Sequence, residues 1–170
     1  IGAGERVADV FAYTGAFASG AASRGARVVC VEQQEPLLEL AKENARLNGV
    51  EGRIEFVAGD AFYWLEAAAA RGERFDWVLL DPPSLAKSKA ETLKGRQALH
   101  HLFVHALGLL APHGTLVLSV CTYHLLGLTE EILRIAAGER HARLRVVGLS
   151  LQAADHPWVL QMPMTRYLMS

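Results

Sequence analysis

The chain has 170 residues, 51% of them hydrophobic and 21% charged, which suffices for a sizeable core and is unlike a disordered protein. Its formal net charge of −1 excludes a domain that holds nucleic acid by a general positive excess, so RNA binding would need a local patch or another domain. No apolar run reaches the roughly 18 residues that cross a bilayer, no secretory leader opens the chain, and we expect a cytoplasmic protein.

Short apolar runs alternate with longer segments of helical periodicity, which is typical of a parallel sheet covered by helices. The runs predict strands at residues 6–11, 27–32, 53–58, 75–81, 115–120 and 143–150, and a last strand near Tyr167. The segments between them predict helices at residues 16–23, 36–48, 61–71, 90–110 and 129–137, with a mobile loop at 84–95. The sequence thus predicts one α/β domain over residues 1–170, with a mostly parallel seven-stranded sheet and helices on both faces.

The first predicted strand ends in a turn with one glycine and several small residues. Ligands of open α/β sheets bind at the carboxyl ends of the strands, and small residues there let a ligand approach the backbone and the next helix N-terminus. Tight packing of the turn is the alternative interpretation. The residues expected to contact a cofactor here are Asp9, Phe11, Tyr13, Thr14 and Gly15.

Another glycine-rich segment, Gly2-Ala3-Gly4, precedes the first strand instead of following it. It therefore lies at the wrong end of the sheet for a phosphate-binding loop. Without a glycine-rich pyrophosphate loop, the sequence favours a nucleoside cofactor such as S-adenosylmethionine over a dinucleotide.

Acidic residues stand at the ends of the second and third predicted strands. Glu32 follows Asp9 by 23 residues, close to the ~20-residue offset at which an acid meets ribose hydroxyls in dinucleotide folds. Asp60 and Ala61 follow the third strand, where a carboxylate can accept a hydrogen bond from an adenine amino group and also cap the next helix. A solvated acid at Glu32 and a helix cap alone at Asp60 are the alternatives.

The fourth predicted strand runs into Asp81-Pro82-Pro83. The prolines lack backbone donors and fix φ, so they hold the Asp81 carboxylate rigidly above the sheet. This arrangement suits a groove for a flat base, and we expect Asp81 to contact both cofactor and substrate; an ordinary turn is the alternative. The residues expected to bind substrate are Pro82, Pro83, Lys87, Lys89 and Arg96.

The fifth predicted strand leads into Cys121. Neighbouring strands lie about 4.8 Å apart, so we expect Cys121 and Asp81 to open onto one crevice as the catalytic residues. A thiolate can add to carbon 6 of cytosine and so activate carbon 5 toward a sulfonium methyl group. Burial in the core is the alternative for Cys121 and the expectation for Cys30, which lies inside the second strand.

Metal binding is not expected. The two cysteines lack the paired spacing of a zinc site. His101 and His105 lie one turn apart on a predicted helix, but the sequence offers them no matching third ligand.

Motifs along nearly the whole chain resemble the PUA-domain-containing, class I large-subunit ribosomal RNA cytosine-C5 methyltransferases. The Tyr-Thr-Gly and Asp-His-Pro elements together are fairly specific. The segments that carry the resemblance are Phe11-Ala12-Tyr13-Thr14-Gly15-Ala16-Phe17, Glu43-Asn44-Ala45-Arg46-Leu47-Asn48, Gly59-Asp60-Ala61-Phe62, Phe75-Asp76, Asp81-Pro82-Pro83, Cys121 and Ala154-Asp155-His156-Pro157.

The resemblance implies a Rossmann-like class I methyltransferase with S-adenosylmethionine as the methyl donor, Glu32 at its ribose and Asp60 at its adenine. It also implies that Cys121 is the nucleophile for methylation of carbon 5 of a cytosine in large-subunit ribosomal RNA. N-terminal PUA and linker domains, outside this chain, are expected to share RNA capture. A homodimer is a further expectation, and a membrane is not an expected partner.

Two segments depart from the family pattern. Lys94-Gly95-Arg96-Gln97 and then His100 stand where family members tend to carry Arg-Gly-Tyr-Lys and an Asn. Val120-Cys121-Thr122 stands where Ser-Cys-Ser is common. These differences concern the RNA target more than the chemistry.

Two other functions fit the same fold. Methylation of a base nitrogen or of a small molecule needs no thiol nucleophile, so Cys121 distinguishes it from carbon methylation. A domain that binds S-adenosylmethionine or RNA without turnover is the third possibility, and the joint presence of Glu32, Asp60, Asp81 and Cys121 argues against it.

Overall fold

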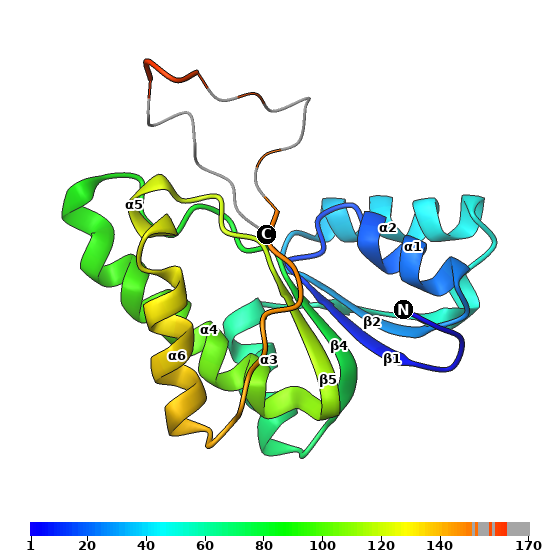
Figure 1. The fold of residues 1–170 in the computed structure, drawn as a ribbon. Coiled ribbons are helices and arrows are strands. Elements are labelled where there is room, and N and C mark those ends of the chain that lie inside the picture. Colours follow the sequence, from blue (N-terminus) through cyan, green and yellow to red (C-terminus); the bar gives the residue numbers. More distant parts are fainter. Residues whose placement is uncertain (151, 153–156, 158, 163–170) are drawn as a thin grey trace. The chain divides into compact units, whose positions relative to one another are not determined.

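The computed structural model describes residues 1–150, 152, 157 and 159–162 (Figure 1). They form two compact units. The first consists of Ile1–Asp81 and Gly108–Val117, and the second of Pro82–Leu107 and the described part of Leu118–Ser170.

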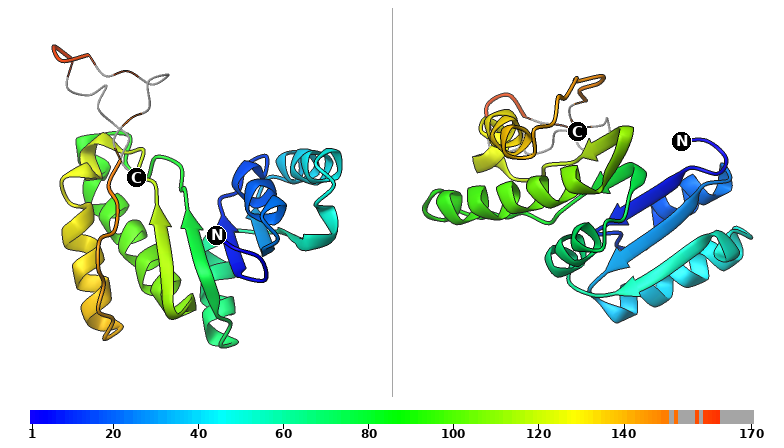
Figure 2. Two further views of the ribbon diagram at one scale, coloured as in Figure 1. Left: turned by 45° about the vertical axis from the view of Figure 1, so that its right-hand side comes forward. Right: turned by 90° about the horizontal axis from the view of Figure 1, so that it is seen from below.

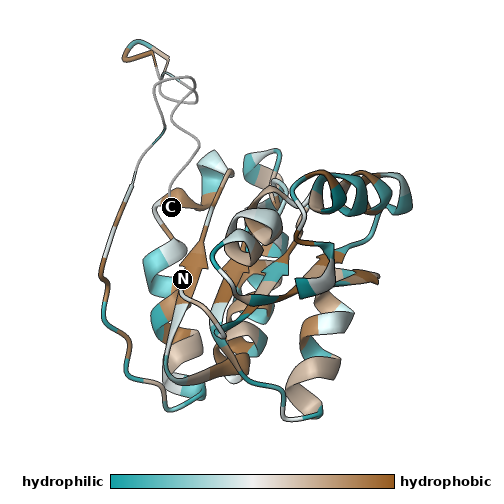
Figure 3. Ribbon diagram, turned by 90° about the vertical axis from the view of Figure 1, so that its right-hand side faces the viewer, coloured by the Kyte–Doolittle hydropathy of each residue, from teal (hydrophilic) through white to brown (hydrophobic). Residues whose placement is uncertain are grey.

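A five-stranded sheet, in the order β3-β2-β1-β4-β5, forms the centre of the first unit. β2 pairs with β1 and with β3, and β1 pairs with β4, all in parallel; Figure 2 shows β1, β2 and β3 side by side in blue to cyan. The strands are hydrophobic along much of their length (Figure 3), as expected for a sheet covered on both faces. Their bounds are Arg6–Val10 (β1), Arg27–Glu32 (β2), Ile54–Ala58 (β3), Phe75–Leu80 (β4) and Leu110–Leu118 (β5).

Three helices connect the first four of these strands: α1 (Ala16–Ser23), α2 (Glu35–Leu47) and α3 (Ala61–Ala70). The chain moves from β1 to β2 to β3 and then returns across the sheet to β4. Because crossover connections are right-handed, the return places α3 on the face opposite to α1 and α2. A short 3-10 helix, η1 (Glu51–Arg53), precedes β3.

Small side chains let α1 and α2 pack closely on their face of the sheet. Alanines of both helices form one buried cluster with Val7, Val28 and Cys30 of the strands: Ala18, Ala21, Ala22, Ala41 and Ala45. The end of α2 is set by Gly49, whose φ of 67 is the left-handed conformation that closes a helix. The carboxyl ends of β1, β2 and β3 are thereby held at one edge of the sheet.

The second unit contains η2 (Lys89–Glu91), α4 (Thr92–Leu109, of which residues up to Leu107 belong here), α5 (Tyr123–Leu126) and α6 (Thr129–Glu139). Two contacts join α4 to α6: an ion pair of Arg96 with Glu131 at 2.6 Å and a hydrogen bond between His100 Nε2 and Glu139 Oε1 at 2.9 Å. Throughout the described part of the chain, no helix combines the length and apolar character of a membrane span.

The seven-strand prediction is not confirmed, since the described residues hold a sheet of five strands. Residues 143–150 form no strand, and their side chains are exposed, Val146 to 79% and Val147 to 75%. An apolar run becomes a strand only where a neighbour accepts its hydrogen bonds, and a sequence pattern does not reveal that neighbour. The strand predicted near Tyr167 lies outside the described residues. The predicted loop at 84–95 contains η2 and the first turn of α4.

Candidate functional site

The turn after β1 is held in an unusual backbone conformation. Phe11 and Tyr13, which are not glycines, have φ angles of 66 and 52, and Gly15 has a φ of 71. A Cβ atom on Gly15 would lie 2.9 Å from the Cβ atom of Ala41 in α2, so only glycine fits. The side chain of Asn44 donates a hydrogen bond to the Thr14 carbonyl at 2.9 Å and fixes the turn from the other side.

Glu32, the last residue of β2, is buried and fastens this turn to the sheet. Its Oε2 atom accepts a hydrogen bond from Tyr13 N and its Oε1 atom accepts one from Gln34 N, both at 2.9 Å. Each carboxylate oxygen has a second lone pair. Glu32 can therefore accept hydrogen bonds from two hydroxyl groups while it positions the backbone around it.

Asp60 follows β3 and caps α3, as predicted. Its Oδ1 atom accepts hydrogen bonds from Phe62 N at 2.8 Å and Tyr63 N at 3.2 Å. Both bonds use Oδ1, which leaves Oδ2 as an acceptor for a ligand. The Phe62 ring meets the Phe11 ring edge-on at 6.0 Å between centroids, which joins the first and third strand ends.

Asp9 lies inside the sheet rather than on its rim, with 1% of its surface exposed. Its Oδ2 atom accepts a hydrogen bond from Ala18 N at 2.8 Å and so anchors α1. Burial raises the pKa of Asp9 to about 7, while the Ala18 hydrogen bond lowers it and the negative charge of Asp81 raises it. Asp9 therefore supports the turn from beneath.

The raised pKa of Asp9 predicts a pH-dependent stability. Well below pH 3.8 the carboxyl group is protonated in both states; between 3.8 and about 7 only the unfolded chain ionises, so the free energy of unfolding falls as pH rises. The loss from this group should total about 4 kcal/mol. Between about pH 4 and about pH 8, the free energy of unfolding measured with urea should fall further for the wild type than for Asp9→Asn. Equal pH dependence of the two proteins would contradict this assignment.

Asp81 follows β4 directly and is exposed. Its backbone N–H donates to the Val10 carbonyl at 3.4 Å, so it lies at the same edge of the sheet as the turn after β1. The first unit thus holds eight of the nine predicted cofactor residues at or just beyond the strand ends: Phe11, Tyr13, Thr14, Gly15, Glu32, Asp60, Ala61 and Asp81. Asp9, the ninth, is buried within β1, so its predicted contact with the cofactor stays a prediction.

The second unit places Cys121 against the proline loop. The Cys121 thiol donates a hydrogen bond to the Pro82 carbonyl at 3.4 Å. Thr122, which is buried, accepts a hydrogen bond from Leu85 N at 3.1 Å and donates one to Ser84 Oγ at 3.4 Å. Three contacts therefore hold the cysteine segment to residues 82–85. The predicted crevice shared with Asp81 stays a prediction.

The two cysteines lie in different environments, and Cys30 is in the core as predicted. Cys30 is fully buried in β2, and burial raises the pKa of its thiol to about 12, with smaller contributions from the charges of Asp9 and Glu32. Such a thiol is protonated and unreactive at neutral pH. Cys121 is only partly buried.

The residues expected to bind substrate are in different environments. Pro83, Lys87 and Lys89 are exposed, whereas Pro82 is buried. Arg96 is bound to Glu131, so its charge is partly offset. An RNA contact by Arg96 remains a prediction and would compete with that ion pair.

Asn44 and Thr122 position the predicted residues, and the sequence did not reveal these roles. Asparagine is a poor residue for a helix interior because its side chain competes for backbone hydrogen bonds. That signal was available for Asn44, which lies inside α2. Thr122 gave no comparable signal, because its contacts depend on how the proline loop folds.

Several known proteins are similar to this chain. The family model described as "Conserved hypothetical protein 95" matches residues 2–114. The protein named ribosomal RNA large subunit methyltransferase I from Serratia proteamaculans (strain 568) is 34% identical over 169 residues, covering 98% of this chain and 43% of that protein. Its namesake from Aeromonas hydrophila is 37% identical over 161 residues, covering 91% and 40%. The chain therefore spans about two-fifths of the length of these relatives.

Solved structures share the fold. SMU.776 complexed with SAH superposes with a TM-score of 0.82 at 22% identity, covering 98% of this chain and 44% of that chain, a likeness that shows the fold alone. The SAM-dependent methyltransferase from Agrobacterium tumefaciens has a TM-score of 0.67 at 26% identity, covering 79% and 44%.

Proposed function

The chain belongs to the family described as conserved hypothetical protein 95 and is a class I methyltransferase catalytic domain, and from this premise we propose that it methylates carbon 5 of a cytosine in large-subunit ribosomal RNA. The observation that carries the proposal is the Cys121 thiol, 3.4 Å from the Pro82 carbonyl of the Asp-Pro-Pro loop. A nucleophile held to that loop is what carbon methylation of cytosine requires and nitrogen methylation does not.

S-adenosylmethionine is the methyl donor, and the residues of the first unit fit it. Glu32 has acceptor capacity for the two ribose hydroxyls, and Asp60 has Oδ2 for the adenine amino group. Gly15 caps α1 without a side-chain hydrogen bond, and Asp9 already accepts from Ala18 N, so the backbone N–H groups of Ala16 and Phe17 suit the carboxylate of the methionine portion. When bound, the cofactor supplies an electrophilic methyl group.

Cys121 activates the base. Its thiolate adds to carbon 6 of cytosine, and the electron pair of the 5,6 double bond becomes available at carbon 5, which attacks the methyl group; the bond from sulfur to that methyl group breaks, and the demethylated donor is released. A base then removes the proton from carbon 5, the double bond re-forms, and the thiolate leaves. Asp81 is the side chain that we assign to the cytosine edge, where a carboxylate accepts a hydrogen bond from an amino group or a protonated ring nitrogen.

The relatives' printed name supports ribosomal RNA as the substrate. Those relatives are more than twice as long as this chain, and the net charge of −1 gives no general attraction to phosphate. We therefore propose that RNA capture is shared with PUA and linker domains of a longer protein. The homodimer stays a prediction.

Incubation of the protein with methyl-labelled S-adenosylmethionine and deproteinised large-subunit ribosomal RNA should transfer label to RNA. Small-subunit ribosomal RNA, treated identically, serves as the control and should remain unlabelled. Label on a small molecule alone, or cofactor binding without any transfer, would contradict the proposed substrate and support one of the two other functions.

A further inference from the structure

Three arginines, Arg6, Arg27 and Arg53, lie at the amino ends of β1, β2 and β3; we refer to them as the arginine row. Arg6 pairs with Arg27 in the β1–β2 register, so both side chains leave the same face of the sheet. Arg53 directly precedes Ile54, which pairs with the residue after Arg27. All three line one cavity of about 800 Å³. This cavity lies at the end of the strands opposite to Glu32 and Asp60.

The cavity carries a positive charge. Glu55 is the one acidic side chain among the described residues that line it, against three exposed arginines. Within the described residues, the Arg27 side chain has no hydrogen bond or ion pair, and Arg53 donates one hydrogen bond, from Nη1 to the Gly25 carbonyl at 3.4 Å. Each guanidinium has five N–H donors, so most donors of Arg27 and Arg53 are available to a ligand.

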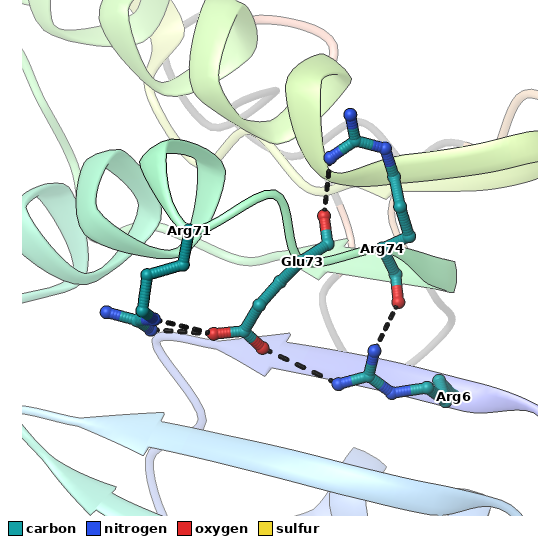
Figure 4. Close-up of polar contacts among 4 residues, drawn as sticks. All are labelled: Arg6, Arg71, Glu73 and Arg74. Carbon is teal, nitrogen blue, oxygen red and sulfur yellow. Dashed lines mark hydrogen bonds and ion pairs between the residues drawn. The ribbon is translucent and has the colours of Figure 1, made fainter.

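The neighbouring acid Glu73 offsets little of this charge, because two arginines share it (Figure 4). Its carboxylate accepts hydrogen bonds from Arg71 at 3.0 and 2.7 Å and from Arg6 at 3.5 Å. Arg6 also donates to the Arg74 carbonyl at 2.8 Å, and its guanidinium lies 4.6 Å from the Phe75 ring centroid. These contacts hold Arg6 in one orientation at the rim of the cavity.

We propose that the arginine row binds the phosphate backbone of the RNA substrate, at a distance from the base that is methylated. Guanidinium groups match phosphate oxygens in geometry and stay charged at every physiological pH. Along β2, Arg27 and Glu32 are five residues apart, about 17 Å at 3.3 Å per residue. Protein–nucleic acid interfaces of about 1,000 Å² or more extend well beyond one nucleotide. The inference rests on the proposed function, because it takes RNA as the substrate.

The test compares two double variants of the full chain. Arg27→Ala with Arg53→Ala removes two charges from the cavity; Arg24→Ala with Arg46→Ala removes two exposed arginines of the first unit that do not line it. Neither pair touches the cofactor residues, so binding of S-adenosylhomocysteine, measured by calorimetry, should match the wild type in both. Retained cofactor binding also shows that the variants are folded.

Binding of deproteinised large-subunit ribosomal RNA is then measured over a range of salt concentrations. The Arg27/Arg53 variant should bind about tenfold more weakly at low salt, and the slope of log K against log salt should fall by about 1.5, or 0.7–0.9 for each lost phosphate contact. The Arg24/Arg46 variant should show a smaller change in both. Equal losses in the two variants would overturn the proposal, because they would show only a net-charge effect.

Two further outcomes separate this inference from the proposed function. If no methyl transfer occurs on any RNA but the Arg27/Arg53 variant alone loses RNA affinity, the proposed reaction is wrong and RNA binding by the arginine row is supported. If polyglutamate displaces RNA from the wild type and binds equally well to the Arg24/Arg46 variant but not to the Arg27/Arg53 variant, the row recognises an acidic protein segment, and the proposal is wrong.

Discussion

Replacing Cys121 with alanine is expected to abolish methyl transfer to RNA. Without the thiolate, carbon 5 of cytosine stays part of an electron-poor ring and cannot attack the methyl group at a useful rate. The same variant should lose a second, independent signal. RNA that carries 5-fluorocytosine at the target should be methylated once by the wild type and then remain attached to Cys121, because fluorine cannot leave as a proton does.

The control is Cys30→Ala. Cys30 is fully buried in β2 and takes no part in the proposed chemistry. The substitution should therefore lower the free energy of unfolding by about 1–3 kcal/mol and leave both methyl transfer and the covalent adduct with fluorinated RNA intact. A denaturing gel of the fluorinated RNA reaction reports the covalent species. Normal methyl transfer by Cys121→Ala, with no adduct from the wild type, would refute the thiolate mechanism and favour nitrogen methylation.

Replacing Glu32 with alanine is expected to weaken cofactor binding at least tenfold. A charged acceptor contributes about 1.5–3 kcal/mol to each hydrogen bond, and Glu32 is assigned to two ribose hydroxyls. The structure adds a second cost, because the change also leaves Tyr13 N and Gln34 N without their acceptors. Calorimetry with S-adenosylhomocysteine measures the loss.

Two matched variants separate these effects. Glu66→Ala removes an exposed carboxylate from α3 and should leave cofactor binding unchanged. Glu32→Gln keeps the shape and one amide oxygen acceptor, but its NH2 group faces one of the two backbone N–H donors, so it should restore only part of the stability and not the affinity. Unchanged binding of S-adenosylhomocysteine by a folded Glu32→Ala protein would remove Glu32 from the cofactor assignment.

Sequence reasoning located the strand ends because the alternating pattern of an α/β sheet fixes where each strand stops. Glu32 ends β2, Asp60 caps α3 and Asp81 follows β4, as predicted. Their hydrogen bonds were beyond prediction: the link from Tyr13 N to Glu32 depends on two residues with positive φ, which no residue preference indicates for Phe or Tyr.

Features that depend on strand register or on partner strands also could not be predicted from the sequence. Arg6, Arg27 and Arg53 are far apart in the sequence, and only the pairing of β1, β2 and β3 brings them into one cavity. The strand predicted at residues 143–150 failed for the related reason that alternating apolar residues do not specify a pairing partner. β5 begins at Leu110 rather than at residue 115, so the prediction placed its start inside the strand.

The central claim, methylation at carbon 5 of cytosine, is tested most directly by locating the transferred methyl group. Large-subunit ribosomal RNA labelled by the protein is digested to nucleosides, which are separated and identified by mass spectrometry. We predict that the label is in 5-methylcytidine. Label in N4-methylcytidine or in a methylated purine, with none in 5-methylcytidine, would contradict the role assigned to Cys121.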